Sequence, residues 1–245
     1  MKYGVIILVL FSMFACKKAE DRRCLKGAGD TTTLEVAKED FSKLFIGPHM
    51  HITLIQDSLD KVVVTSGQNL VKHIGTDIIE GQLRIENNNR CNFLRSYKHQ
   101  VYVEVHFTDL TEIYMEGTKP VMCEGQLNFG NLLVIIRDGA GAMNLNINSN
   151  NFDLVVTNGW GNFDIKGVTN NLKLDIRNNG FGNTYGLEVV NELNVISNTA
   201  GKLEVFAGNA DLNAQTASSG DIWYKGIPSN INYTALGSGE LLDKN

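Results

Sequence analysis

The sequence predicts an all-β protein whose main body is a solenoid of stacked strands with rungs of about 20 residues. Apolar and polar residues alternate with a period of two along most of the chain, and glycine-rich turns punctuate its second half. Equivalent apolar positions recur there at intervals of 19 to 21 residues, at Leu154, Leu174, Val195, Ala214 and Tyr233. A meander or sandwich of short hairpins is the alternative that such strands also allow.

The amino terminus has the pattern of a secretory signal. Lys2 precedes an apolar run from Val5 to Phe14, and Ala15 stands before Cys16. The run is shorter than the roughly 20 apolar residues that span a bilayer. Residues 1–15 are therefore predicted to be a signal peptide. It is either a lipoprotein signal that ends at a modified Cys16 or, as the alternative, an ordinary secretory signal followed by an incidental cysteine.

The end of this segment, Ala15-Cys16, resembles a bacterial lipobox. The resemblance implies acylation at Cys16, so the membrane becomes a partner through a lipid anchor, and two or more acyl chains hold a protein there stably. The residue after Cys16 is Lys17 and not Asp. In this position the sequence resembles lipoproteins that are not retained at the inner membrane. We therefore expect an outer-membrane lipoprotein, on the periplasmic or the cell-surface side.

Residues 16–37 are predicted to be the lipidated cysteine and a flexible tether. Charged residues come first and are followed by Gly27-Ala28-Gly29 and three threonines, with no apolar period that could pack against a core. The folded solenoid is expected to span residues 38–245.

The solenoid divides into a looser half, residues 38–128, and a half of regular repeats, residues 129–245. The first half contains alternating segments at residues 51–55, 61–65, 82–86 and 100–107, and one or two turns of helix are expected around 69–74. In the second half each repeat is a strand, a glycine-rich corner, a second strand and a loop. The outward asparagines can stack into hydrogen-bonded ladders between rungs.

Composition restricts the partners. The formal net charge is −5 and the basic residues form no stripe, so we expect no nucleic acid partner. Cys91 and Cys123 lie in the predicted body, where an oxidising compartment would allow a disulfide. The sequence supports equally well that Cys91 and Cys123 are two separate thiols.

Repeated glycine corners after short alternating strands, such as Gly139-Ala140-Gly141 and Gly237-Ser238-Gly239, resemble the head-GIN domain. This family is labelled an auto-transporter adhesin and is common in lipoproteins of Bacteroidota. The resemblance covers the chain from about residue 38 to its end. It implies a right-handed parallel β-helix-like fold, an envelope location and no established catalytic residues.

The carboxylates do not form an evident catalytic pair. A glycosidase needs two carboxyl groups about 5 to 10 Å apart, and successive rungs are about 4.8 Å apart. The outward columns that follow from the repeat stack no two carboxylates, and at the corners only Asp221 and Glu240 align. We therefore expect no catalytic residue, and the sequence predicts neither a metal site nor a cofactor.

Aromatic residues at outward positions are the candidate ligand contacts. Trp160 and Phe181 are expected at equivalent corners one rung apart, and Trp223 lies between two inward positions. Exposed rings stack on sugars or on protein side chains, although rings at these positions can also simply cover the flank of the solenoid. The leading hypothesis is a non-enzymatic envelope adhesin that binds a glycan or protein. A periplasmic structural or assembly component and a carbohydrate-active β-helix enzyme are the alternatives.

Overall fold

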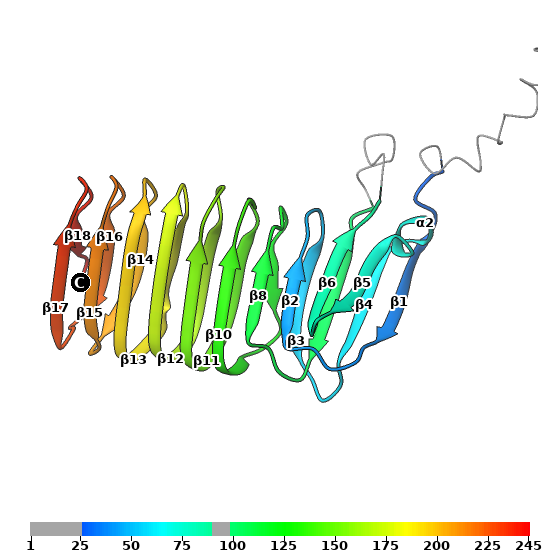
Figure 1. The fold of residues 1–245 in the computed structure, drawn as a ribbon, viewed down its shortest axis with the longest axis horizontal. Helices are drawn as coiled ribbons and strands as arrows, with labels where there is room; N and C mark the ends of the chain where they lie inside the picture. Colours follow the sequence, from blue (N-terminus) through cyan, green and yellow to red (C-terminus); the bar gives the residue numbers. More distant parts are fainter. Residues whose placement is uncertain (1–25, 90–98) are drawn as a thin grey trace, which may run out of the picture.

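The computed structural model describes residues 26–89 and 99–245 and confirms the solenoid. The regular structure of this part is almost entirely β-strand, and the strands are stacked along one long axis with the carboxy-terminal rung at one end (Figure 1). One short helix is present in the described residues, α2 (Gln68–Val71), close to the position that the sequence suggested. The predicted signal peptide, Cys16 and Cys91 lie outside the described residues.

The rungs form two sheets that face each other across the core. The first sheet contains, in spatial order, β5 (Ile74–Ile79), β6 (Gln82–Asn87), β2 (Lys43–Ile46), β8 (Glu112–Met115), the second parts of β10 (Leu127–Ile136), β11 (Ala142–Val156), β12 (Asn162–Asn178) and β13 (Phe181–Thr199), then β15 (Asp211–Thr216) and β17 (Asn230–Ala235).

The second sheet runs β1 (Thr31–Ala37), β4 (Lys61–Gly67), β7 (Tyr102–Phe107), β3 (His51–Gln56), β9 (Val121–Cys123), the first parts of β11, β12 and β13, then β14 (Leu203–Gly208), β16 (Ile222–Gly226) and β18 (Leu241–Asp243). The long strands β11 to β13 bend from one sheet into the other.

The parallel register in the second half is the one that the repeat predicts. Leu154 pairs with Leu174, Leu174 with Val195, and Val195 with Ala214. These side chains are buried on the inside, while the intervening polar residues point outward. Each rung buries its apolar face only against its neighbours, so the stack as a whole closes one continuous core.

Asparagine ladders connect the outer ends of the rungs, as expected. The Asn171 amide donates to Asn151 over 2.8 Å, and the Asn151 amide donates to Asn131 over 2.5 Å. A second ladder joins Asn148 to Asn128 over 3.0 Å. Each bond ties one rung to the next at the solvent boundary, where it holds the register of the stack.

The looser period of residues 38–128 has a topological cause. The rung formed by β2 and β3 pairs on one side with β6 and β7 and on the other side with β8 and β9. Rungs that are adjacent in space are therefore not consecutive in the chain. Leu44 lies beside both Leu83 and Ile113, so no interval of 20 residues connects them.

The amino-terminal end corrects one sequence prediction. Residues 31–37, expected to be tether, form β1, which pairs antiparallel with β4 from Thr31 beside Gly67 to Ala37 beside Lys61. No residue of β1 is fully buried, so the apolar alternation that marks other strands is absent. Its backbone hydrogen bonds hold it in place, and these leave no trace in the side-chain pattern.

The same end is closed by other antiparallel elements. β4 runs antiparallel to β7, and β5 runs antiparallel to β6. The side chains of Leu70 and Val71 in α2 are buried, and Phe41 is buried in the same core. None of the helical residues in the described ranges forms an apolar helix long enough to cross a membrane.

Candidate functional site

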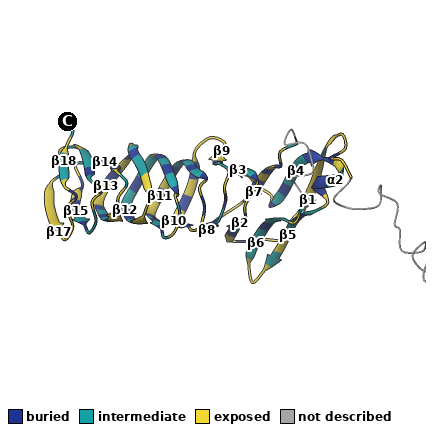
Figure 2. Ribbon diagram, turned by 90° about the horizontal axis from the view of Figure 1, so that it is seen from above, coloured by how far each residue is buried: buried dark blue, intermediate teal, exposed yellow. Residues whose placement is uncertain are grey.

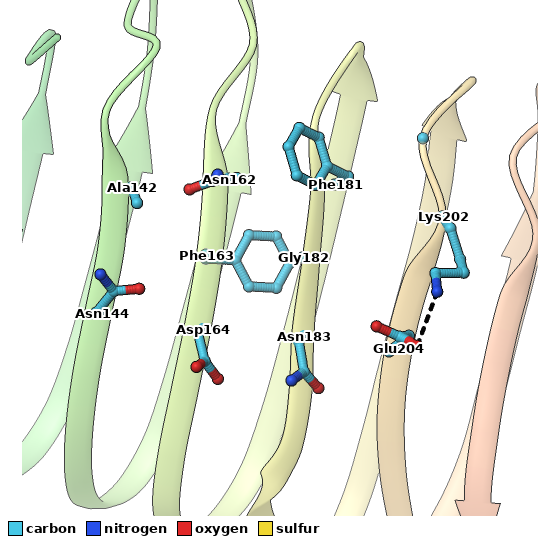
Figure 3. A pocket seen from close by; sticks show the side chains of 11 residues that line it. Ala142, Asn144, Asn162, Phe163, Asp164, Phe181, Gly182, Asn183, Lys202 and Glu204 are labelled. Atoms are coloured by element: carbon cyan, nitrogen blue, oxygen red, sulfur yellow. Dashed lines mark hydrogen bonds and ion pairs between the residues drawn. The ribbon is translucent and has the colours of Figure 1, made fainter. Parts of the chain in front are cut away.

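A shallow groove of about 390 Å³ lies on the second sheet, across β11, β12, β13 and β14 (Figure 3). Its polar lining is a column of outward side chains on four successive rungs, namely Asn144, Asp164, Asn183 and Glu204. A second column, nearer the corner, contributes Asn162 and Phe181. The groove therefore combines amides, carboxylates and one aromatic ring.

Beneath the groove, Gly182 leaves space for the buried ring of Phe163. Phe163 points inward and is buried, and Gly182 lies beside it in the next rung. A Cβ at Gly182 would lie 2.5 Å from carbons of the Phe163 ring, so the ring occupies the inward space of both rungs. Phe163 and Gly182 are both among the residues that line the groove (Figure 3).

The charges of the groove are partly compensated within it. The Lys202 ammonium donates to the Glu204 carboxylate over 2.8 Å, and Lys166 lies 3.6 Å from the Asp164 carboxylate. The other oxygen of Asp164, Oδ1, is buried and accepts no hydrogen bond from the described residues. A buried acceptor without a partner is costly, so this oxygen lowers the stability of the rung.

The structure separates Trp160 from Phe181 in register. Phe181 pairs with Asn162, and its N–H donates to the Gly161 carbonyl over 3.3 Å. The prediction of equivalent corners is therefore wrong by two positions. Aligning Trp160 with Phe181 makes the corner after Ile176 one residue longer than the corner after Val156, whereas it is one residue shorter. Both rings are nevertheless exposed, 65% for Trp160 and 41% for Phe181, and of the two only Phe181 lines the groove.

Trp223 is half-buried on the second sheet beside Glu204. The Lys202 and Lys244 ammonium groups lie 4.1 and 4.4 Å from the centre of its ring. These cation–π contacts occupy the ring faces that a sugar would need. A ligand contact at Trp223 stays a prediction, and this residue does not line the groove.

Sequence reasoning missed the role of Tyr185 on the same sheet. The Tyr185 N–H donates to Asn183 Oδ1 over 2.8 Å, which orients an amide of the groove. The Lys225 ammonium lies 4.6 Å from the Tyr185 ring centre, and burial, then the Glu204 charge, raises the pKa of Tyr185. A register shift between Asp164 and Lys166 hides this placement from a fixed repeat.

The carboxylate columns need one correction. The two columns that start at Asp153 and Val155 stack as predicted, and the Glu240 N–H donates to Asp221 at the corner over 2.9 Å. However, Glu192 and Asp211 lie side by side in adjacent rungs. This column directly precedes the paired inward leucines Leu172, Leu193 and Leu212, so it follows the repeat and lies beside the two columns that the sequence prediction considered.

The stacked pair is solvated and amide-bonded. Asn213 donates to Glu192 over 2.9 Å, and Asn230 donates to Asp211 over 2.7 Å. Both carboxylates are exposed and neither lines the groove. Glu192 and Asp211 are therefore surface carboxylates that continue an asparagine ladder.

The cysteine pairing stays a prediction, because Cys91 lies outside the described residues. Cys123 is half-buried, and its sulfur accepts a hydrogen bond from the Asn146 N–H over 3.1 Å. Within the described ranges no cluster of three His, Cys, Asp or Glu side chains has the geometry for a metal ion.

These features define the class of the protein. It is a parallel solenoid of two sheets, with a groove on one face that has an aromatic ring at its edge. Residues 40–228 match the family described as "Putative auto-transporter adhesin, head GIN domain". The chain belongs to this family.

Solved structures have the same fold. A protein of Bacteroides fragilis described as a "putative adhesin" has a TM-score of 0.79 at 18% identity, over 89% of this chain and 99% of that chain. A "putative adhesin" of Parabacteroides distasonis has a TM-score of 0.67 at 18% identity, over 89% and 99% of the two chains. A "putative lipid binding protein" of the same species has 0.65 at 17% identity, over 89% and 98%. No curated protein matches the sequence.

Proposed function

We propose that the protein is a non-enzymatic adhesin of the cell envelope that binds a glycan in the groove over β11 to β14. The observation that carries this proposal is the combination of an exposed Phe181 ring with a column of amides and carboxylates on one face. An aromatic ring stacks on the apolar face of a sugar, carboxylates accept hydrogen bonds from its hydroxyls, and amides both donate to and accept from them. The family description supports a surface or envelope location.

The groove suits binding better than hydrolysis. Its two carboxylates, Asp164 and Glu204, lie two rungs apart, and each lies near a lysine, Asp164 near Lys166 and Glu204 near Lys202. A glycosidase acid needs a raised pKa, which a neighbouring ammonium opposes. The carbohydrate-active enzyme therefore has less support than the adhesin.

Loss of the Phe181 ring is expected to weaken glycan binding about tenfold, because an aromatic stacking contact contributes about 1 to 1.5 kcal/mol. Binding is first sought on an array of bacterial and host glycans and then titrated by calorimetry for the wild type and Phe181→Ala. Tyr102→Ala is the matched control, since Tyr102 is an exposed aromatic on β7, outside the groove. Equal affinity of all three proteins would place the ligand elsewhere.

A lipid ligand is the second class to include in this screen, because one structural neighbour is described as lipid binding. Phospholipid vesicles serve as the probe, with the acylation site removed by Cys16→Ala so that an anchor cannot insert. Vesicle binding that persists in Phe181→Ala together with no glycan signal would overturn the proposal.

The proposed envelope location rests on acylation of Cys16. The Cys16→Ala variant is expected to leave the membrane fraction for the soluble fraction, since the acyl chains supply the attachment. Membrane fractionation measures this, and protease treatment of intact cells tells which side the protein faces. Protection of the wild type until the outer membrane is broken would remove the adhesin and favour the periplasmic assembly component.

A further inference from the structure

The carboxy-terminal end of the solenoid is an open cross-section of the core. In β15 the inward residues Leu212 and Thr216 are 0% exposed, because β17 covers them. The inward residues of β17 have no further rung, so Ile231, beside Leu212, is 46% exposed, and Tyr233, beside Ala214, is 39% exposed. Figure 2 shows β17 as an exposed strand at this end of the molecule. In the described ranges β17 pairs with β15 alone.

Nothing on β17 discourages another strand from pairing with it. Native edge strands are commonly protected by charged side chains, proline or bulges. The amino-terminal edge strands carry such charges, Glu35 on β1 and Asp77 on β5. The sequence from Ser229 to Gly239 contains no charged residue and no proline, and its strand is regular.

The two ends of the solenoid are unlike, which restricts the partner. Antiparallel strands and α2 close the amino-terminal end, so a second copy cannot stack its open end there as a further parallel rung. Two copies can satisfy their open ends only by meeting end to end. Such an interface is isologous and closes at two chains, whereas a head-to-tail contact would continue into a fibre.

We propose that the open carboxy-terminal end docks a second copy of this chain, with β17 antiparallel to β17 of the copy about a two-fold axis at Tyr233. Opposite residues of an antiparallel pair point to the same face. In this register Ile231 faces the Ala235 position of the copy and Tyr233 faces its own equivalent, so inward residues meet inward residues. Asn232 then lies opposite the Thr234 position, so polar residues meet on the outside.

The Tyr233 ring is positioned for this contact. Its hydroxyl is 2.8 Å from Thr216 Oγ1 and donates to the Gly239 carbonyl over 2.9 Å, so the ring is held across the end of the core. Ala214, beside Tyr233 in β15, leaves room for the ring within the rung. A ring fixed at both ends presents a preorganised flat surface, which lowers the entropic cost of association.

The size of the end sets the strength of the dimer. One rung is about 20 Å long and its two sheets are about 10 Å apart. The buried area therefore falls below the roughly 1,200 Å² of stable complexes, and we expect dissociation constants on the order of 10–100 µM.

Sedimentation velocity across a concentration series, with Cys16→Ala and a reducing agent to exclude lipid and disulfide association, tests the proposal. We expect the mass to rise from one chain to two and no further. The variant Asn232→Lys/Thr234→Lys places lysines opposite each other twice and should weaken the dimer at least tenfold. Its control is Asn213→Lys/Gln215→Lys, the same two columns one rung inward, which should leave the dimer intact.

Charge reversal distinguishes pairing from a loss of folding. Mixing the edge lysine variant with Asn232→Asp/Thr234→Asp should restore a dimer that neither variant forms alone. A wild type that stays monomeric at 1 mM, masses beyond two chains, or equal effects of the edge and inner lysine pairs would each overturn the proposal. This outcome is independent of glycan binding at Phe181, which lies in β13 on the other sheet.

Discussion

Gly167 is the residue at which the close approach of neighbouring rungs is most severe. It lies in the inward column between Ile147 and Leu187, with φ at +112°, a conformation that residues with a side chain rarely adopt. A Cβ at this position would lie 1.9 Å from the Ile147 carbonyl oxygen. Backbone geometry and contact distance therefore both require glycine here.

Gly167→Ala is expected to lower the free energy of unfolding by about 2 to 4 kcal/mol, since strained φ alone costs about 1 to 3 kcal/mol and the clash adds to it. The matched control is Gly130→Ala, where a Cβ meets nothing within 4 Å and φ is not positive. We expect the control to stay within about 0.5 kcal/mol of the wild type. Urea unfolding measures both, and equal midpoints for the two variants would contradict the steric argument.

At the scale of elements, the sequence determines most where the repeat length is constant. From Leu154 to Tyr233 the apolar period places each inward side chain and predicts the outward columns, since one residue per position recurs in each rung. A corner that is one residue shorter is enough to separate Trp160 from Phe181 in register. Local pattern cannot detect this, because the inward residues of the flanking strands still alternate.

The first half could not be predicted from periodicity for a different reason. β1 buries no side chain completely, so its sequence has no amphipathic pattern. The rung of β2 and β3 receives its neighbours from residues that come 39 and 69 positions later, such as Leu83 and Ile113 beside Leu44. Such pairings depend on the path of the whole chain. Only part of the groove could be predicted. Phe181 was identified as an aromatic residue at an outward position, whereas the positions of Gly182 and Tyr185 depend on the register between β12 and β13.

At the scale of the molecule, the solenoid behaves as a one-dimensional stack with unequal ends. Each rung is stabilised by its neighbours, so interior rungs have two partners and the last rung has one. The amino-terminal end is closed by antiparallel strands, while β17 leaves its inward residues in solvent. Local stability should therefore decrease from the interior toward the carboxy-terminal end.

Amide hydrogen exchange followed by mass spectrometry is expected to show this gradient. Amides of β12 and β13, which pair on both sides, should exchange the slowest, and those of β17 should be the fastest among the paired strands of the first sheet. Protein concentration separates intrinsic fraying from docking: dilution should speed exchange in β17 and leave β1 unchanged, because only β17 lies in the proposed dimer. If β17 were as protected as β12 at the lowest concentration, the last rung would hold itself together without a partner, and the nearest-neighbour description of the stack would be wrong.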